Sequence, residues 1–447
     1  MPNKKLTASV CTLGCRVNQY ESDCIISGFK KLGFEIKNFG DICDVYVINT
    51  CTVTAGSDKK SKQMIRRAKK LNPSAIIAVC GCFSQNNPDI FTSDLKADII
   101  VGTSEKTKIP KLALEAIHNL KLTIHNLVKD IGENKTYENI NAYQSEKTRA
   151  YIKIQDGCGF KCSYCIIPQV RGCVKSRGYA DIYAEIKRFN DMDYHEIVLT
   201  GIEISSYCVD KEIAGQARND GLINLLEKLN AEPELNNITS IRLSSVDPSL
   251  IKKDFIDRLV NLDKIANHFH LSLQSGSTKI LNQMRRRYNA ETVIKNIAYA
   301  KEKIKDLNLT ADIIVGFPGE TDEDFEKSVE MVKLLNIYHA HIFAYSKRPG
   351  TDAADFDGQV DESIKNSRSK KLFEICEKIK EDIHRENVGR EFEVIIEDLN
   401  KDGFYTAKTR NFIDVKIKAR DCVNFHGAVR NIKITEFDKD FMYGEIL

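Results

Sequence analysis

Three cysteines within eight residues limit what this chain can fold into more than any other feature does. Cys158, Cys162 and Cys165 follow the spacing C-x3-C-x2-C, and no fourth cysteine follows close behind them. A structural zinc site needs four ligands, usually in paired spacings, whereas an iron–sulfur cluster is held by thiolates. Three thiolates on a four-iron cluster would leave one iron open for chemistry. A zinc knuckle with a distant fourth ligand, or a chance grouping of thiols, is the alternative.

The residues before these cysteines indicate where they lie in a fold. Residues 150–155 have the pattern of a buried strand, and Asp156 and Gly157 end that strand. We therefore expect the thiols in a loop at the carboxyl end of a strand, where α/β enzymes hold their active sites.

Composition sets broader limits. The chain has 447 residues, too many for one hydrophobic core, so two or three domains are expected. No apolar run approaches membrane length and the first residues lack a signal-peptide pattern, so we expect a cytoplasmic protein without a membrane partner. In that compartment, 14 cysteines favour metal binding or catalysis over a disulfide framework. The formal net charge of +3 excludes no class of partner.

The amino-terminal part, residues 1–127, alternates short apolar strands with amphipathic helices, as a parallel α/β sheet does. Cys15, Cys51 and Cys82 each lie in the turn that follows one of its strands. Because parallel strands end at one edge of a sheet, these thiols are candidates for a single metal centre. The alternative is three thiols buried in an apolar core. The strands are expected at 8–11, 44–48 and 75–79, and the helices at 17–31 and 58–71.

Two other cysteines compete for the same assignment. Cys11 and Cys80 lie within the first and third strands, where packing in the core is the default role of a thiol. We prefer Cys82 to Cys80 because Cys82 lies beyond the end of its strand.

The rest of the chain divides into a linker, a central domain and a small carboxy-terminal domain. Residues 128–148 are polar and weakly patterned, as linkers are. Residues 149–383 alternate strands with helices, which predicts a partial (β/α)6 barrel with a connecting helix at 362–388 and an insertion at 207–220. Short strands within 384–447 predict a small antiparallel β-barrel, so the fold class is α/β with a β-barrel appended. The central strands are expected at 151–155, 196–200, 240–244, 269–273, 311–315 and 341–345.

With this cysteine motif after a strand that opens a βα barrel, the chain resembles the radical S-adenosylmethionine superfamily. Within it, the chain is similar to the methylthiotransferases over essentially its whole length, and its last domain resembles their RNA-binding (TRAM-like) module. The amino-terminal motifs that carry the resemblance are Thr12–Asn18, Asn49–Thr54 and Gly81–Gln85. The central motifs are Gln155–Cys158, Ile166–Pro168, Arg171–Gly172, Leu199–Gly201, His270–Gly276, Gly316–Glu320 and Tyr345–Ser346.

The resemblance implies a role for each group of thiols. Cys158, Cys162 and Cys165 would hold a [4Fe–4S] cluster that binds S-adenosylmethionine and cleaves it to a 5′-deoxyadenosyl radical. The other three, Cys15, Cys51 and Cys82, would hold an auxiliary [4Fe–4S] cluster that holds or donates the sulfur atom. A second S-adenosylmethionine would supply the methyl group, and no catalytic residue is assigned beyond the two clusters.

Five residues are candidates for binding the S-adenosylmethionine cofactor. Tyr164 lies between two cluster ligands and is suited to contact with adenine or to packing under the loop. Gly201 permits close backbone approach after a strand. Glu203, Ser245 and Gln274 lie at or just beyond strand ends, where each would bind polar groups of the cofactor or serve as an ordinary barrel residue.

Three basic stretches are candidates for contact with RNA phosphates. One lies on the helix after Cys51, one near the expected cofactor edge and one in the terminal barrel. A run of charge is usually a solvated face, but a run beside a proposed cluster together with one in a β-barrel favours phosphate contact. The candidate residues are Lys59, Lys62, Arg66, Arg285, Arg287, Lys408, Arg410, Lys416 and Lys418.

Three stretches resemble one branch of the family most closely, the enzymes that act on N6-threonylcarbamoyladenosine in tRNA. They are His270–Gly276, Met284–Tyr288 and Lys347–Thr351. The resemblance implies methylthiolation of carbon 2 of that nucleoside at position 37, in the tRNA anticodon loop, with an electron donor protein and a sulfur donor as further partners. Sister branches act on isopentenyladenosine in tRNA or on an aspartate of a ribosomal protein, and a non-enzymatic iron–sulfur RNA sensor is a third alternative.

Overall fold

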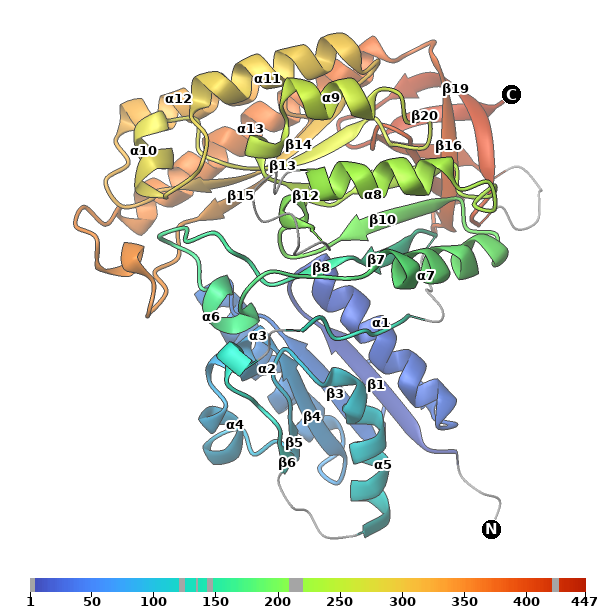
Figure 1. The fold of residues 1–447 in the computed structure, drawn as a ribbon, viewed down its shortest axis with the longest axis vertical. Coiled ribbons are helices and arrows are strands. Elements are labelled where there is room, and N and C mark those ends of the chain that lie inside the picture. The colour runs from blue at the N-terminus through green and yellow to red at the C-terminus, as the bar shows by residue number, and fades with distance from the viewer. Residues whose placement is uncertain (1–4, 120–124, 134–135, 143–147, 209–219, 420–425) are drawn as a thin grey trace. The chain divides into compact units, whose positions relative to one another are not determined.

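The computed structural model describes residues 5–119, 125–133, 136–142, 148–208, 220–419 and 426–447 (Figure 1). The chain forms two compact units, of which the first contains residues 1–145, 155–177 and 346–354 and the second 146–154, 178–345 and 355–447. All six predicted cluster ligands therefore belong to the first unit. Each unit combines segments that are separate in sequence, so the units do not test the domain boundaries expected at residues 127, 148 and 383. These boundaries stay predictions. The insertion expected at 207–220 lies almost wholly outside the described residues.

The first unit is built on a six-stranded sheet in the order β2-β1-β3-β4-β5-β6, and each neighbouring pair is parallel. The strands are β1 (Thr7–Thr12), β2 (Glu35–Ile36), β3 (Val45–Thr50), β4 (Ile76–Gly81), β5 (Ile99–Ile100) and β6 (His125–Asn126). One face is covered by α1 (Arg16–Lys31) and α5 (Ile109–Asn119). The other is covered by α2 (Ala55–Leu71), α3 (Cys82–Asn86) and α4 (Asp89–Ser93).

Strand β3 shows why this sheet has a hydrophobic core on both faces. Val45 and Val47 enter the core beneath α1 and α5, while Tyr46 and Ile48 enter the core beneath α2. A strand that is buried on both faces appears in the sequence as a continuous apolar run. The three strands and two helices expected in this part of the chain are confirmed to within a few residues.

A short loop region completes the first unit. It contains β8 (Gln155–Asp156), which pairs in antiparallel fashion with β9 (Lys175–Ser176), and α6 (Ile167–Arg171) between them.

The second unit contains a partial barrel of parallel strands, which confirms the expected central fold. The strand order is β7-β10-β11 in one sheet and β12-β13-β14-β15 in a second. Ser244 lies between β11 and β12, and its amide donates to Leu199 O at 3.0 Å. The strands are β7 (Ala150–Lys153), β10 (Glu196–Thr200), β11 (Ser240–Leu243), β12 (Ser245–Val246), β13 (His268–Gln274), β14 (Asn308–Val315) and β15 (His339–Ala344). The helices are α7 (Tyr179–Asp191), α8 (Asp220–Ala231), α9 (Lys253–Leu259), α10 (Thr278–Gln283), α11 (Ala290–Lys303), α12 (Asp322–Leu334) and α13 (Glu362–Glu386).

The carboxy-terminal strands form a closed barrel in the order β16-β17-β18-β20-β19. The sequence predicted an antiparallel barrel, and four of its neighbouring pairs are antiparallel, but β18 and β20 pair in parallel. An odd number of strands cannot alternate direction all the way round a closed ring, so at least one pair must be parallel. The strands are β16 (Glu391–Leu399), β17 (Phe404–Thr409), β18 (Asp414–Lys418), β19 (Val429–Phe437) and β20 (Met442–Ile446).

The turn between β17 and β18 docks this closed barrel onto the partial barrel within the second unit. The ring of Phe412 stacks on His268 with centroids 4.5 Å apart, and the Arg242 guanidinium lies 5.0 Å from the centre of the same ring. Asn308 donates to the backbone oxygen of Asn411 at 3.0 Å. Aromatic stacking and cation–π contact thus join two domains that are separate in sequence.

A buried ion-pair group lies beside this docking contact. Glu196 on β10 accepts two hydrogen bonds of 2.9 Å from the Arg242 guanidinium and one of 3.1 Å from Ser240. Arg149 Nε lies 2.7 Å from the same carboxylate. Burial alone would raise the pKa of Glu196, but the charges of Arg242 and Arg149 outweigh it and lower the pKa to about 2.

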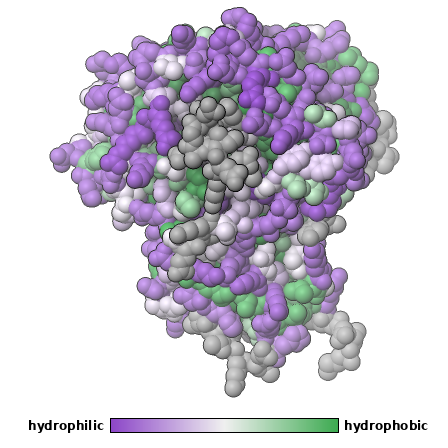
Figure 2. Space-filling model, in the orientation of Figure 1, coloured by the Kyte–Doolittle hydropathy of each residue, from purple (hydrophilic) through white to green (hydrophobic). Residues whose placement is uncertain are grey.

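The visible face of the molecule is mostly hydrophilic, with scattered apolar side chains (Figure 2). None of the described helices combines the length and the apolar character that crossing a lipid bilayer demands.

We expect Glu196→Gln to lower the stability of the second unit by about 3–5 kcal/mol at neutral pH, because it leaves Arg242 buried without its carboxylate and Arg149 with Glu397 as its remaining partner. A folded-state pKa near 2, below the unfolded value of 4.5, means that this stabilisation is complete above about pH 5 and is lost as pH falls. Urea unfolding between pH 4 and 8 measures both effects. Glu227→Gln, which breaks the more exposed pair with Arg258, is the control and should cost about 1 kcal/mol or less. Equal losses in the two variants would contradict the prediction.

Candidate functional site

The first candidate centre lies at the carboxyl edge of the amino-terminal sheet. Cys15 precedes α1, Cys51 follows β3 and Cys82 begins α3. Gly14 shows how closely the first two turns approach, because a Cβ atom added there would lie 2.8 Å from Cys51 Cβ and 2.9 Å from Cys51 Sγ. The φ of Gly14 is +99°, which also favours glycine. The turn that carries Cys15 therefore fits against Cys51 only with a glycine before it.

Electrostatic interaction links all three thiols of this centre. Burial raises the pKa of Cys51, and charge on the nearby Cys82 and Cys15 adds to the rise, to about 11. Each thiolate makes ionisation of the neighbouring thiols harder. Because a metal binds the thiolate form, its binding ionises the thiols together and releases their protons. The donor set thus fits a metal cluster, which would relieve the repulsion among the thiolates.

The structure places the competing cysteines elsewhere. Cys80 lies inside β4, fully buried in the core beneath α1 and α5, and burial raises its pKa to about 12. Cys11 lies in β1 and packs against the core on the opposite face. Both positions are those of structural thiols, which supports the choice of Cys82 as the ligand candidate.

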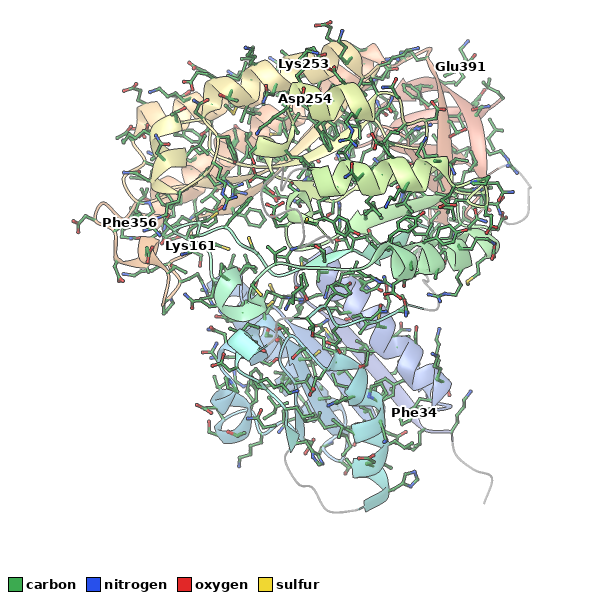
Figure 3. All side chains as sticks on the ribbon, in the orientation of Figure 1. Phe34, Lys161, Lys253, Asp254, Phe356 and Glu391 are labelled. Atoms are coloured by element: carbon green, nitrogen blue, oxygen red, sulfur yellow. The ribbon has the colours of Figure 1, made fainter. Side chains whose placement is uncertain are left out.

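The second candidate centre is the loop from Cys158 to Cys165, whose three cysteines are half-buried. The amide of Cys158 donates to Gly172 O at 3.0 Å, and the amide of Cys165 donates to Cys162 O at 3.1 Å. Gly157 has a φ of +72°, and a side chain there would overlap the backbone oxygen of Cys173. Lys161, labelled in Figure 3, is exposed between the first two cysteines. The loop is therefore fixed at its start by glycine and by backbone hydrogen bonds.

Arg171, the last residue of α6, is fully buried and connects the surroundings of the two groups of thiols. Its Nε donates to Cys82 Sγ at 3.4 Å, and its terminal nitrogens donate to the Glu21 carboxylate at 2.6 and 3.1 Å. It also donates to Asn18 at 2.6 Å and lies 3.3 Å from both carboxylate oxygens of Asp156, which ends the strand before the cysteine loop. One side chain therefore contacts a thiol of the first centre and the base of the second.

Lys106 balances the charge of this buried group. Its Nζ pairs with Glu21 and donates to Asn49 at 3.3 Å, so two cations face the carboxylates of Glu21 and Asp156. A buried ion pair persists only where hydrogen bonds satisfy its members, as they do here. Arg171 belongs to one of the motifs that carry the family resemblance, but the resemblance implied no role for it. A basic residue at the end of the mostly apolar stretch 166–171 was the available signal.

Distances between ligand atoms separate a single metal ion from a larger cluster. Around one zinc ion with bonds of about 2.3 Å, sulfur atoms lie about 3.8 Å apart. Among the described residues, the one group of three Cys, His, Asp or Glu ligand atoms within 4.8 Å of one another contains no cysteine. In the described part of the chain, neither triad of thiols therefore shows that close spacing. All cysteines in the described part of the chain are free thiols.

The predicted cofactor residues are divided between the two units. Tyr164 is half-buried in the first unit, and the other four belong to the second. Gly201 follows β10, Ser245 lies in β12, and Gln274 ends β13 with a left-handed φ of +65°. The positions at strand ends are those that the sequence indicated, and binding of the cofactor stays a prediction.

Glu203 is the predicted cofactor residue whose pKa is clearly shifted. It accepts a hydrogen bond from the Ser205 amide at 2.9 Å, and Ser205 in turn accepts one from the Asp247 amide at 3.0 Å. Burial, with the charge of Asp247, raises the pKa of Glu203 to about 7. Asp247 itself pairs with Arg286. A buried carboxyl poised near neutrality is typical of functional sites, and sequence reasoning did not identify its partners Asp247 and Arg286.

The predicted RNA contacts differ in their availability. Lys59, Arg66, Arg285, Arg287 and Lys418 are exposed. In the closed barrel, Lys408 pairs with Asp414 and Lys416 lies 4.2 Å from the centre of the Phe441 ring. Lys62 lies 5.8 Å from the Phe83 ring on α3.

Arg410 has an intramolecular role that the sequence did not indicate. Its guanidinium donates to the backbone oxygen of Asp263 and, at 3.0 Å, to that of Ile265, in the partial barrel. It therefore helps to dock the closed barrel, which makes it the least available of the predicted RNA contacts.

Two family models match the chain. Residues 152–332 match the radical SAM superfamily, and residues 7–102 match a family described as an uncharacterized protein family, UPF0004. The two matches begin in β7 and at the start of β1, strands that precede the two groups of thiols.

Relatives of named function match nearly the whole chain. The threonylcarbamoyladenosine tRNA methylthiotransferase MtaB of Bacillus subtilis is 35% identical over 99% of this chain and 96% of its own length. The protein of the same name from Aquifex aeolicus is 36% identical over 91% of this chain and 95% of its own length. A tRNA-2-methylthio-N(6)-dimethylallyladenosine synthase of Caldicellulosiruptor saccharolyticus is 33% identical, with 99% and 93% covered.

The fold also matches a solved structure. The radical S-adenosylmethionine methyltransferase TsrM from Kitasatospora setae, with cobalamin and a [4Fe-4S] cluster bound, gives a TM-score of 0.55 at 14% identity. The match covers 78% of this chain and 77% of that one, and at this identity it concerns the fold alone.

We expect Arg171→Ala to destabilise the first unit by about 3–5 kcal/mol, because Glu21 would remain buried without its main partner. Thermal and urea unfolding of the metal-free protein measures the loss. Arg66→Ala, which removes the exposed pair with Asp94, is the matched control and should change stability by about 1 kcal/mol or less. If Arg171→Ala and Arg66→Ala unfold at the same urea concentration, the prediction is wrong and the ion pairs of Arg171 do not stabilise the first unit.

Proposed function

Because this chain belongs to the radical S-adenosylmethionine tRNA methylthiotransferases, we propose that it transfers a methylthio group to carbon 2 of N6-threonylcarbamoyladenosine at position 37 of tRNA. The observation that carries the proposal is the pair of cysteine triads, one at a sheet edge and one in a strand-end loop, within one compact unit. The two relatives named for this nucleoside support the choice of substrate. Membership of the radical SAM superfamily implies S-adenosylmethionine and one [4Fe–4S] cluster as cofactors.

We assign the two triads separate tasks. When bound at Cys158, Cys162 and Cys165, a [4Fe–4S] cluster supplies the electron that cleaves S-adenosylmethionine. The loop contributes a fixed backbone, through Gly157 and its hydrogen bonds, that holds the three thiolates in one arrangement.

The second triad, Cys15, Cys51 and Cys82, is our candidate for an auxiliary cluster that handles the transferred sulfur. Arg171 holds Cys82 in place and excludes water from its sulfur atom, because both residues are buried and in contact. Hydrogen bonds to cluster sulfurs are one of the means by which proteins adjust a cluster.

Recognition of tRNA requires cations that face solvent. The exposed residues Lys59 and Arg66 on α2, Arg285 and Arg287 after α10, and Lys418 in the closed barrel are our first candidates for phosphate contact. An electron donor protein and a sulfur donor complete the partners that the reaction needs.

A sister substrate is favoured by one observation, since the dimethylallyladenosine synthase of Caldicellulosiruptor saccharolyticus is almost as similar to this chain. The chain should therefore be expressed in a bacterial strain that lacks its own tRNA methylthiotransferases, and its tRNA nucleosides analysed by mass spectrometry. We expect the methylthio form of N6-threonylcarbamoyladenosine to appear and that of isopentenyladenosine to stay absent. Cys158→Ala is the inactive control. The opposite pattern would assign the chain to the sister substrate.

Iron and sulfide analysis tests the second cluster. After anaerobic reconstitution, replacement of Cys158, Cys162 and Cys165 by Ala should remove about half of the iron, and replacement of Cys15, Cys51 and Cys82 should remove the other half. Cys80→Ala, a buried core thiol, is the control and should keep the full iron content. An unchanged iron content in the second triple variant would show that the protein has one cluster.

A further inference from the structure

Histidine is concentrated in one small part of the second unit. The chain has 9 histidines, and four of them form two H-x-H pairs, His268 and His270 on β13, and His339 and His341 on β15. Alternate residues of a strand share one face. Strand β14 lies between them, and its residue Asp312 pairs in register with His341. His270 belongs to a motif that carries the family resemblance, but the sequence analysis predicted no metal site here, although two H-x-H pairs on strands that flank a T-x-D sequence are visible in the chain.

Three ligand atoms meet on this face of the sheet. His270 Nε2 lies 3.2 Å from Asp312 Oδ1, and His341 Nδ1 lies 3.2 Å from the same oxygen. The three atoms all lie within 4.8 Å of one another. In a tetrahedral site with metal–ligand bonds of about 2.0–2.1 Å, neighbouring ligand atoms are about 3.3 Å apart. The two distances to Asp312 therefore match edges of a metal coordination shell.

A second layer of contacts orients the first ligand. Thr310 pairs in register with His270, and its Oγ1 lies 2.8 Å from His270 Nδ1 and 2.9 Å from His268 Nε2. Metal-binding histidines almost always use their other ring nitrogen in such a contact, which turns the free nitrogen toward the metal. Here that contact directs Nε2 of His270 to Asp312.

The carboxylate at the centre is kept ionised. Burial would raise the pKa of Asp312, but hydrogen bonds from His270 and His341 outweigh burial and hold the pKa well below its usual range. An ionised oxygen that faces two imidazole nitrogens offers one negative charge to a cation.

We propose that His270, Asp312 and His341 bind a divalent transition metal ion of the Zn²⁺ class, at a site separate from both cysteine triads. Imidazole nitrogens exclude Mg²⁺ and Ca²⁺ as preferred ions, because those cations select oxygen ligands. Three protein ligands leave at least one coordination position open, as in catalytic rather than structural zinc sites. His341 is 49% exposed, so an ion and a further ligand can enter from that side.

The site belongs to the second unit, whereas all six candidate cluster ligands belong to the first, so metal binding here does not depend on the proposed methylthio transfer. The competing explanation is a proton-bridged group, in which Asp312 accepts hydrogen bonds from two imidazolium rings without a metal.

Metal titration of the full chain separates these explanations. In the protein with all six cluster cysteines replaced by Ala, Co²⁺ should bind at one equivalent with visible absorption that lacks thiolate charge transfer, and Zn²⁺ should displace it. Asp312→Asn and His341→Ala should each weaken binding by at least tenfold, and Thr310→Val by about 10–100-fold through loss of ligand orientation. His339→Ala, which alters a neighbouring ring outside the triad, is the control and should bind as the parent does.

A second measurement avoids reliance on the chain that lacks the six cluster cysteines. The reconstituted protein with intact cysteines should hold about one more equivalent of zinc than its His341→Ala variant after incubation with Zn²⁺ and desalting. The proposal is overturned if parent and His341→Ala bind Co²⁺ equally, or if the two reconstituted proteins retain the same amount of zinc.

Discussion

Parallel pairing of neighbouring strands is the constraint on which both candidate sites depend. Strands β1, β3 and β4 run in one direction, so the turns that carry Cys15, Cys51 and Cys82 emerge at the same edge of the sheet although they are far apart in sequence. In the second unit, the same kind of pairing between β13, β14 and β15 aligns a histidine, an aspartate and a histidine on one face. Ligands beyond strand ends and ligands within strands thus have one physical origin.

The first unit adds a buried ionic group to that constraint. Glu21, Asp156, Arg171 and Lys106 come from segments that are separate in sequence, and each is held by partners of opposite charge. Charge removed from water is stable only when its partners are complete, so the network requires that α1, the cysteine loop and α6 fold together.

The second unit shows how one domain alters the role expected of another. The turn at the end of β17 packs Phe412 between His268 and Arg242, and Arg410 donates to carbonyl groups of the partial barrel. Basic residues near this turn therefore serve docking. Lys418 remains exposed and is among the proposed contacts with an anionic partner. The net charge of a sequence does not distinguish docking from contact with an anionic partner. The role of each basic residue depends on whether carbonyl groups of the protein or phosphates of a partner lie next to it.

The amino-acid sequence by itself determined the α/β alternation, the family and the positions of the cysteines relative to strand ends, because apolar periodicity and glycine-bounded turns are local properties. It also predicted the terminal barrel, though not its parallel pair, which follows from closing a ring of five strands. Only the tertiary structure decided that Cys80 belongs to the core, that Arg171 contacts Cys82, and that His270, Asp312 and His341 meet. Each of these depends on which strand lies beside which and on the register between them, and no local pattern in the chain specifies that.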